Sequence, residues 1–292
     1  MVKESSANLP RAKQILPGSP KEFKCIKDQV CRTQLALVII CLITLAFFLL
    51  GGFLVSDDYM KYFGSGLWLA RASAFAILIL TLMCILAISR DLLTALRCRG
   101  CCGAHCSCIL NEHLMYHKFC GFLIMVFSVL HTVGHLYGTL PAMANETDLD
   151  VLNSKLTYAN FSKIYTYEYL LFGTIPGLTG VILIITILLI WILSLPCVRR
   201  RKWEVFSYSH VLYWVFLIGM VLHGFGGWFN DAIPPTAFLM GATTLLLSFQ
   251  MIRRRCQTHT CKTQIERILI NKDKTYLYVK LYKPPGMMIQ PG

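Results

Sequence analysis

The feature that most constrains the fold is an apolar stretch, Tyr116–Leu140, which is long enough to cross a bilayer yet contains three histidines. Because an imidazole in hydrocarbon is costly, a histidine inside a membrane helix marks a candidate functional site. His117 and His131 lie fourteen positions apart, which is about 21 Å along a helix and about 40° around it. One helix face therefore carries a histidine near each membrane surface, an arrangement that suits two metal centres stacked across the bilayer.

A second apolar stretch, Tyr208–Phe225, places His210 and His223 thirteen positions apart. Neutral imidazole is a haem iron ligand, so two helices with two histidines each can hold two bis-histidine haems. In an ideal helix, however, these two histidines would point about 140° apart. We therefore expect this helix to be distorted near Gly219, or the haems to approach it from different sides.

The composition is that of a membrane protein: of 292 residues 55% are hydrophobic, and the mean hydropathy is +0.57. The sequence predicts an all-α bundle of six transmembrane helices. These segments are Gln34–Val55, Gly66–Ile88, Tyr116–Leu140, Leu170–Leu195, Tyr208–Phe225 and Ile233–Ile252. The fourth has no histidine and is predicted to be scaffold. Gly173, Pro176, Gly177 and Gly180 in its outer half predict a kink or close helix packing. Met1–Lys27 is polar and does not resemble a signal peptide.

The net charge of +13 could suggest nucleic acid, but the basic residues cluster on alternate sides of the six segments. This pattern predicts a multi-pass membrane protein with both termini cytosolic and with basic runs that contact lipid head groups. The plasma membrane is its expected location. None of the thirteen cysteines falls in a predicted external loop, so no disulfide is expected. The glycosylation sequons at Asn145 and Asn160 do fall in such a loop, which predicts a glycoprotein.

Four further residues are candidates, each with a simpler structural interpretation. Arg71, near the outer end of the second segment, could snorkel to the surface or pair with a haem propionate or a reduced-oxygen species. Arg90, at the inner end, could anchor the helix or serve an inner haem in the same way. His135 is an interfacial histidine or a group that positions or protonates a substrate. Phe216 is either a core residue or an aromatic between two haems.

Two regions outside the six segments carry patterns of their own. The cysteine cluster Cys98–Cys108 could be acylated, bind zinc or remain as free thiols. Residues Thr263–Ile270 and Thr275–Tyr282 alternate apolar and polar, which predicts the first hairpin of a cytosolic β-domain. We therefore divide the chain into a cytosolic tail (1–33), a haem-binding transmembrane domain (34–255) and an incomplete β-domain (256–292).

With these residues identified, the chain from about Ala70 onward resembles the NADPH oxidase family of superoxide-generating flavocytochromes. The resemblance rests on LARASA, SRDLLTALR, YHKF…SVLHTVGHL, PGLTGV and RRRKWEVFSYSHVLYWVFLIGMVLHG. It implies a ferric-reductase-like bundle in which His117 and His210 hold an inner haem b and His131 and His223 an outer one. It also places Arg71 and His135 at the outer oxygen-reducing site and Phe216 between the haems, and it makes the final QPG the opening of an FAD-binding barrel.

The chain departs from this pattern in two ways. Val211 and Phe127 stand where the family has further, non-ligating histidines, and the rest of the FAD barrel and the NADPH lobe do not follow. The resemblance implies electron transfer from a cytosolic NADPH and FAD donor to external oxygen in the full-length protein, with superoxide as product. A transmembrane ferric reductase and a truncated regulatory form are the alternatives. Expected partners are oxygen, membrane lipids, and a small membrane subunit or cytosolic regulators.

Overall fold

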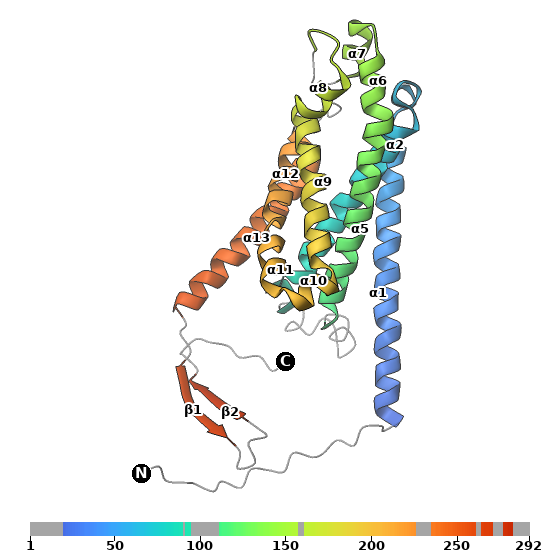
Figure 1. Cartoon of the computed structure of the whole chain (residues 1–292). Helices are drawn as coiled ribbons and strands as arrows, with labels where there is room; N and C mark the ends of the chain where they lie inside the picture. Colours follow the sequence, from blue (N-terminus) through green and yellow to red (C-terminus); the bar gives the residue numbers. More distant parts are fainter. Residues whose placement is uncertain are drawn as a thin grey trace.

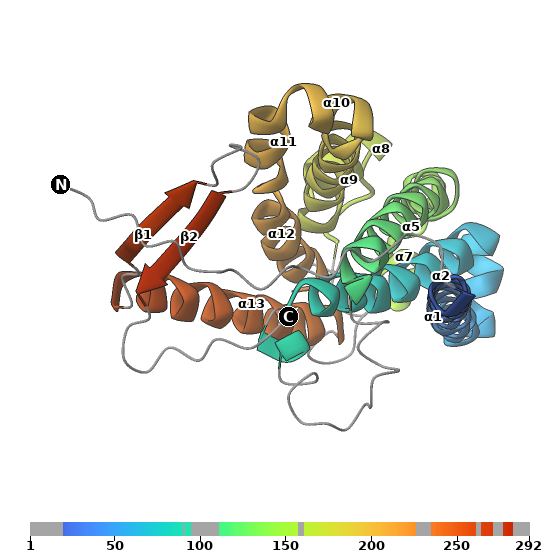
Figure 2. The same ribbon diagram turned by 90° about the horizontal axis from the view of Figure 1, so that it is seen from below.

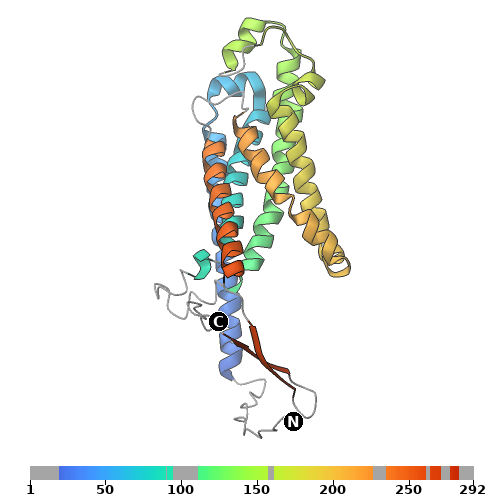
Figure 3. The ribbon, with the colours of Figure 1, turned by 90° about the vertical axis from the view of Figure 1, so that its left-hand side faces the viewer.

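The structure, a computed structural model, describes residues 20–89, 91–94, 111–156, 161–225, 235–260, 264–270 and 277–282. It is a bundle of long helices with a cap of short helices at one end and two strands at the other (Figures 1 and 3). The long elements are α1 (Pro20–Phe53), α2 (Asp57–Ile88), α5 (His113–Gly134), α9 (Ile175–Ser194), α12 (Tyr213–Phe225) and α13 (Pro235–Thr260). The shorter ones are η1 (His135–Thr139), α6 (Leu140–Asn145), α7 (Leu149–Lys155), α8 (Tyr167–Phe172), α10 (Pro196–Arg201), α11 (Trp203–His210), β1 (Gln264–Ile270) and β2 (Leu277–Tyr282).

Five helices close into a ring around the bundle axis. In ring order α2 contacts α5, α5 contacts α9, α9 contacts α12, α12 contacts α13, and α13 contacts α2 again. Figure 2, which looks along the bundle, shows this arrangement with α1 outside it beside α2. The ring brings both histidine-bearing segments against α9, so the imidazoles of α5 and of α11 and α12 can meet in its interior.

Within the described residues, five helices are long and apolar enough to cross a membrane: Val30–Phe53, Asp57–Ile88, His113–Asn145, Ile175–Ser194 and Trp203–Phe225. The chain is therefore a multi-pass membrane protein. The sixth predicted segment coincides with most of α13, which is not among these five, so its crossing stays a prediction. The outer face of α1 agrees with a lipid environment, because Leu42 is 59% exposed and Leu49 is 53% exposed.

Two boundaries differ from the sequence prediction. Residues 56–65, which separate the first two predicted segments, are mostly helical: the Ser56 side chain accepts a hydrogen bond from the Tyr59 N–H, and α2 begins at Asp57. The chain turns at Gly64, whose φ of 68° suits glycine. The fourth segment is two helices, α8 and α9. Pro176 lies in the first turn of α9 behind the cap Thr174, so it starts a helix and does not kink one.

The buried side chains form two clusters. The larger one fills the ring, with Leu80, Phe216 and Met240 among its members. The smaller one joins the cap to the first half of α2 and includes Phe63, Leu67, Leu140, Met143, Leu152 and Leu170. This second cluster explains why the segment after α5 folds back over the bundle, since its leucines and Met143 bury against α2.

The strands β1 and β2 pair antiparallel, from Gln264 opposite Tyr282 to Ile270 opposite Leu277, with an irregularity between Ile265 and Arg267. They follow α13 at the end of the bundle away from the cap (Figure 3). Whether they open a flavin-binding barrel stays a prediction. The predicted domain limits after residues 33 and 255 fall inside α1 and α13, so that division also stays a prediction.

Candidate functional site

Two pairs of histidines face each other across the ring. The ring centroids of His117 on α5 and His210 on α11 are 6.0 Å apart. Those of His131 on α5 and His223 on α12 are 6.1 Å apart. Two imidazoles that bind one metal ion from opposite sides, each through a metal–nitrogen bond of about 2 Å, have centroids roughly 6 Å apart. Both pairs therefore have the spacing of two ligands to a single ion.

The second histidine helix is distorted, as its spacing required, but at a different place from Gly219. It is divided into α11, which ends at His210, and α12, which begins at Tyr213. Across the break the Val211 N–H bonds the Tyr208 carbonyl at 3.2 Å, and the Leu212 N–H bonds the Ser209 carbonyl at 3.0 Å. Hydrogen bonds from residue i to residue i−3 are those of a 3₁₀-helix, which turns about 120° per residue, whereas an α-helix turns about 100° per residue. The overwinding rotates His223 toward the face of His210.

The two α5 histidines each bind a peptide carbonyl of α2 through Nδ1. His131 Nδ1 lies 2.8 Å from the Ala70 carbonyl oxygen, and His117 Nδ1 lies 3.1 Å from that of Cys84. Because a carbonyl only accepts, each Nδ1 carries the proton, and each Nε2 keeps a free lone pair. Histidines that bind metals almost always donate their other N–H to such a partner. The Cys84 thiol also lies 3.1 Å from His117 Nδ1.

The opposite histidines bind side-chain hydroxyls of α9. His223 Nδ1 lies 2.9 Å from Thr179 Oγ1, and His210 Nδ1 lies 3.4 Å from Ser194 Oγ. The sequence predicted that this segment is scaffold, because it contains no histidine. The sequence contains one signal for these contacts. Thr179 and Ser194 are fifteen positions apart, which is close to the thirteen positions that separate His210 from His223.

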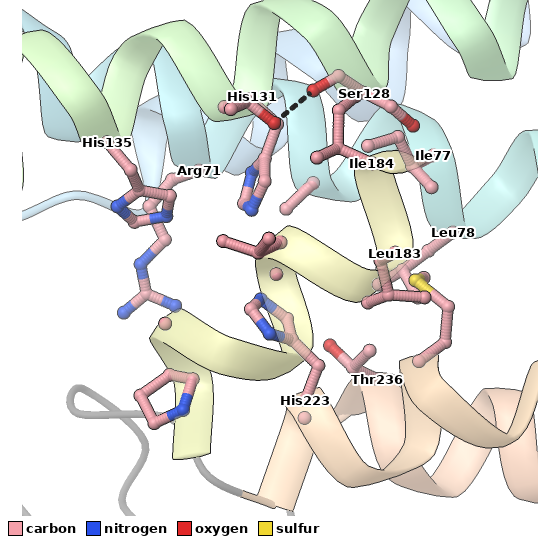
Figure 4. A pocket seen from close by; sticks show the side chains of 18 of the residues that line it. Arg71, Ile77, Leu78, Ser128, His131, His135, Leu183, Ile184, His223 and Thr236 are labelled. Atoms are coloured by element: carbon pink, nitrogen blue, oxygen red, sulfur yellow. Dashed lines mark hydrogen bonds between the residues drawn. The ribbon is translucent and has the colours of Figure 1, made fainter. Parts of the chain in front are cut away.

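A cavity of about 530 Å³ lies at the His131–His223 pair, here called the outer pair as the resemblance has it. Its volume is within the range of about 300–1,000 Å³ that ligand pockets usually have. Figure 4 shows the imidazoles of His131 and His223 on opposite sides of it. Arg71, His135 and Phe216 also line it, so three of the predicted candidates belong to one site. Gly180 of α9 lies beside the His223 ring, which a Cβ at this position would meet at 3.5 Å, an ordinary van der Waals contact.

His135 lies beside the outer pair at a local change of helix type. Its ring is 4.7 Å from that of His131, and its Nδ1 is 3.1 Å from the buried Thr139 hydroxyl. From His135 to Thr139 the chain forms a π-helix, in which the Leu140 N–H bonds the His135 carbonyl. Single π-turns are frequent at functional sites. The helical periodicity of the sequence did not predict this one.

Glycines bring α2 and this outer end of α5 into close contact. A Cβ on Gly66 would lie 2.5 Å from the Gly138 Cα, and one on Gly134 would lie 2.7 Å from the Gly66 carbonyl oxygen. Real Cβ atoms do not approach so closely, so only glycine permits this spacing. The contact holds Arg71 of α2 at the same level as His131 and His135.

The residues present fit haem. Each facing pair could supply two imidazole ligands, and the described residues contain no group of three or more His, Cys, Asp or Glu that could hold a metal ion. Two protein ligands suit an iron whose other ligands belong to a macrocycle. Arg90, predicted to serve an inner haem, and the Cys98–Cys108 cluster lie outside the described residues. Phe216 is 6% exposed in the core of the ring.

The sequence matches known proteins over the same region. The family described as "Ferric reductase like transmembrane component" matches residues 74–221. NADPH oxidase 1 of Mus musculus is 30% identical over 192 residues, which are 59% of this chain and 32% of that protein. NADPH oxidase 4 of Homo sapiens is 29% identical over 187 residues, 62% of this chain and 32% of that protein.

A more distant organism supplies a similar match. A superoxide-generating NADPH oxidase heavy chain of Dictyostelium discoideum is 28% identical over 180 residues, 58% of this chain and 24% of that protein. The chain spans about a third of the length of the mammalian relatives it matches. The resemblance to NADPH oxidases is thereby confirmed, and a match over half of its residues shows that the chain belongs to the ferric reductase like transmembrane family.

Proposed function

We propose that the chain conducts electrons one at a time across a membrane, through two b-type haems, from a cytosolic donor to oxygen on the other side. The product is superoxide: one electron reduces one oxygen molecule, and no proton is required. The donor is reduced nicotinamide acting through a flavin, the classes of cofactor that NADPH and FAD represent. The observation that carries the proposal is the two facing histidine pairs, 6.0 Å and 6.1 Å apart.

Each pair has a distinct place in this scheme. His117 and His210 would hold the inner haem, and His131 and His223 the outer one. Bound haem would supply a one-electron carrier at each level of the bundle. The protein orients the four imidazoles through their Nδ1 hydrogen bonds, so that Nε2 of each is available to iron.

The outer cavity has the charge that an oxygen acceptor requires. Arg71 places a positive charge beside the outer pair, where it favours an anion that develops from neutral oxygen. His135 is held by Thr139 and lines the same cavity, so it can position the acceptor or provide a proton to it. Phe216 is buried in the core and lines the same cavity; in this proposal it is the aromatic side chain between the two haems.

The basic clusters give the orientation. We propose that both termini and the α10–α11 end lie in the cytosol, and that the cap of α6 to α8 lies outside, in a plasma-membrane protein. Asn145, exposed at the end of α6, then carries a glycan. Sequon Asn160 lies outside the described residues. Cytosolic regulators or a small membrane subunit would bind at the cytosolic end or along the lipid-facing helices.

A transmembrane ferric reductase is the second candidate, because the matching family bears that description. Both functions use the same haem-binding histidines, and they differ only in the acceptor. A truncated regulatory chain without activity of its own is a third. The relative rates of reaction with oxygen and with a ferric chelate separate the first two, and haem content separates both from the third.

The proposal is tested by a reduced-minus-oxidised optical spectrum of the purified full chain, with haem quantified per polypeptide. We expect two low-spin haems in the native protein and one each in His131→Ala and His117→Ala. His113→Ala, which removes a neighbouring histidine at the start of α5, is the matched control and should retain both. A native chain without haem would refute the electron-transfer function and leave the regulatory one.

A further inference from the structure

We propose that α9 controls the two haem ligands opposite α5 through a pair of hydroxyls, Thr179 for His223 and Ser194 for His210. This inference rests on the proposed function, because it concerns how strongly the histidines donate to bound iron. It assigns a role to α9, a ring helix that contributes no metal ligand. In this role Thr179 and Ser194 are positioning residues: they act through the histidines and do not touch the iron.

The two hydroxyls match the two levels of the site. Thr179 and Ser194 are fifteen positions apart, which corresponds to about 22 Å along α9 and about 60° around it. One face of α9 therefore presents a hydroxyl at each histidine pair. The contacts are 2.9 Å from Thr179 Oγ1 to His223 Nδ1 and 3.4 Å from Ser194 Oγ to His210 Nδ1.

The helix fixes the direction of these hydrogen bonds. Thr179 Oγ1 donates to the Ile175 carbonyl at 2.6 Å, and Ser194 Oγ donates to the Ile190 carbonyl at 2.6 Å. A hydroxyl has one proton, so once it bonds its own helix it can only accept from the imidazole. Nδ1 of His210 and of His223 must then carry the proton. Each Nε2 keeps its lone pair, the form that binds iron.

The consequence for bound haem follows from ligand basicity. An imidazole whose N–H donates a hydrogen bond is a stronger electron donor to the metal. Stronger donation favours the oxidised iron and lowers its potential. On the α5 side the acceptors are peptide carbonyls, which substitution cannot remove. On the α9 side His210 has the Ser194 hydroxyl, and His223 has the Thr179 hydroxyl beside the Pro176 backbone carbonyl. A substitution can therefore remove one acceptor at each haem separately.

The test is a potentiometric titration of the haem absorbance in the purified full chain. Thr179→Val keeps the shape of the side chain and removes the acceptor. We expect it to raise one of the two midpoint potentials by about 59 mV, the equivalent of a tenfold change for one electron. Ser194→Ala should raise the other. The matched control is Thr243→Val, which removes a buried hydroxyl with the same 2.6 Å bond to its own helix, on α13.

A conservative variant keeps the result interpretable. Thr179→Ser retains the hydroxyl and should behave as the native protein. Thr179→Val could lose its outer haem. In that case, a Thr179→Ser chain that keeps both haems at native potentials would still support the inference. Loss of the outer haem from both variants would overturn it. Unchanged potentials in Thr179→Val and Ser194→Ala, or equal shifts in the control, would also overturn it. Absence of haem from the native chain would refute the proposed function itself.

Discussion

In the proposed function, one side chain, Arg71, determines which acceptor the outer site favours. Its charge lines the cavity beside His131, and it would stabilise an anion formed from oxygen. We predict that Arg71→Ala slows reoxidation of the dithionite-reduced chain by oxygen about 10²-fold, as loss of one preorganised charge-stabilising group does in enzymes. Stopped-flow absorbance of the haem measures this directly, and no flavin domain is needed.

The control for this prediction is Arg71→Lys, which keeps the charge and should lose much less rate. His135→Ala should also slow the reaction while both haems remain bound. Oxygen rates that stay native in Arg71→Ala, together with a slowed reaction with a ferric chelate, would favour the ferric reductase instead.

Glu146 provides a second residue-scale prediction, at the outer end of the bundle. Its carboxylate accepts hydrogen bonds from the Asp148 N–H at 3.0 Å and from the Tyr62 hydroxyl at 2.7 Å. These donors, with the Asp148 N–H the largest cause, lower the pKa of Glu146 below its ordinary value of 4.5. A lowered folded-state pKa stabilises the fold above the ordinary value, and this stabilisation is lost as the pH falls through the lowered one.

The melting temperature of the purified chain should therefore fall below about pH 4.5, and part of that decrease should be missing in Glu146→Gln. Tyr62→Phe removes one donor and should show an intermediate pH dependence. An identical acid profile in the native chain and Glu146→Gln would contradict this role of the carboxylate.

At the same scale, the histidines show what a sequence can reveal. An imidazole inside an apolar segment is conspicuous, and the interval of fourteen residues places two of them on one face. Thr179 and Ser194 were not predicted, because a hydroxyl in a membrane helix can always satisfy itself on its own backbone. Their role depends on which helix packs beside α12, and a single sequence does not contain that information.

At the scale of elements, the approach of α2 and α5 depends on glycine. We predict that Gly134→Ala destabilises the chain by about 1–3 kcal/mol, because the new methyl group would lie 2.7 Å from the Gly66 carbonyl oxygen. Gly121→Ala is the matched control on the same helix: no atom lies within 4 Å of its Cβ position, and the change should be neutral or slightly stabilising.

Thermal unfolding in detergent measures the stability of both variants, and haem content measures the outer site. Gly134→Ala should lose the outer haem before the inner one, because the new methyl group clashes with α2 beside Ala70, whose carbonyl oxygen accepts the His131 Nδ1 hydrogen bond. Equal stability of the two variants would show that the outer end of α5 can shift without cost.

The break between α11 and α12 marks the limit of element-scale prediction. The interval of thirteen residues required a distortion between His210 and His223, and the structure contains one. The position of Gly219 did not predict where the distortion lies, because the break is made by backbone hydrogen bonds at Val211 and Leu212. The π-helix at His135 was missed for the same reason, since its residues have the apolar pattern of an ordinary helix.

For the whole molecule, hydropathy predicted the membrane class and the positions of the long helices, and five of the six segments qualify as spans in the structure. It did not predict the ring order, in which α9 stands between both histidine segments. It also missed the packed cap, because α6, α7 and α8 are short and bury leucines that an isolated loop would expose.

The final prediction concerns the sidedness of the whole chain. None of its thirteen cysteines lies in a predicted external loop, so a membrane-impermeant thiol reagent should not label the native chain in intact cells. Ser154→Cys adds a thiol at an exposed position of α7 in the cap, and Ser207→Cys adds one at an exposed position of α11. We expect labelling of the Ser154→Cys chain in intact cells and of the Ser207→Cys site only after permeabilisation.

The glycan provides an independent measure of the same orientation. In the native chain, treatment with a glycosidase should increase the electrophoretic mobility. Asn145→Gln should reduce this mobility shift by the contribution of one glycan, whereas Thr147→Ser preserves the sequon and should leave the shift unchanged. The opposite labelling pattern would place the cap, and with it Arg71 and His135, in the cytosol. Electrons could then not reach external oxygen through the outer pair, and the proposed direction of transfer would be wrong even if both haems were bound.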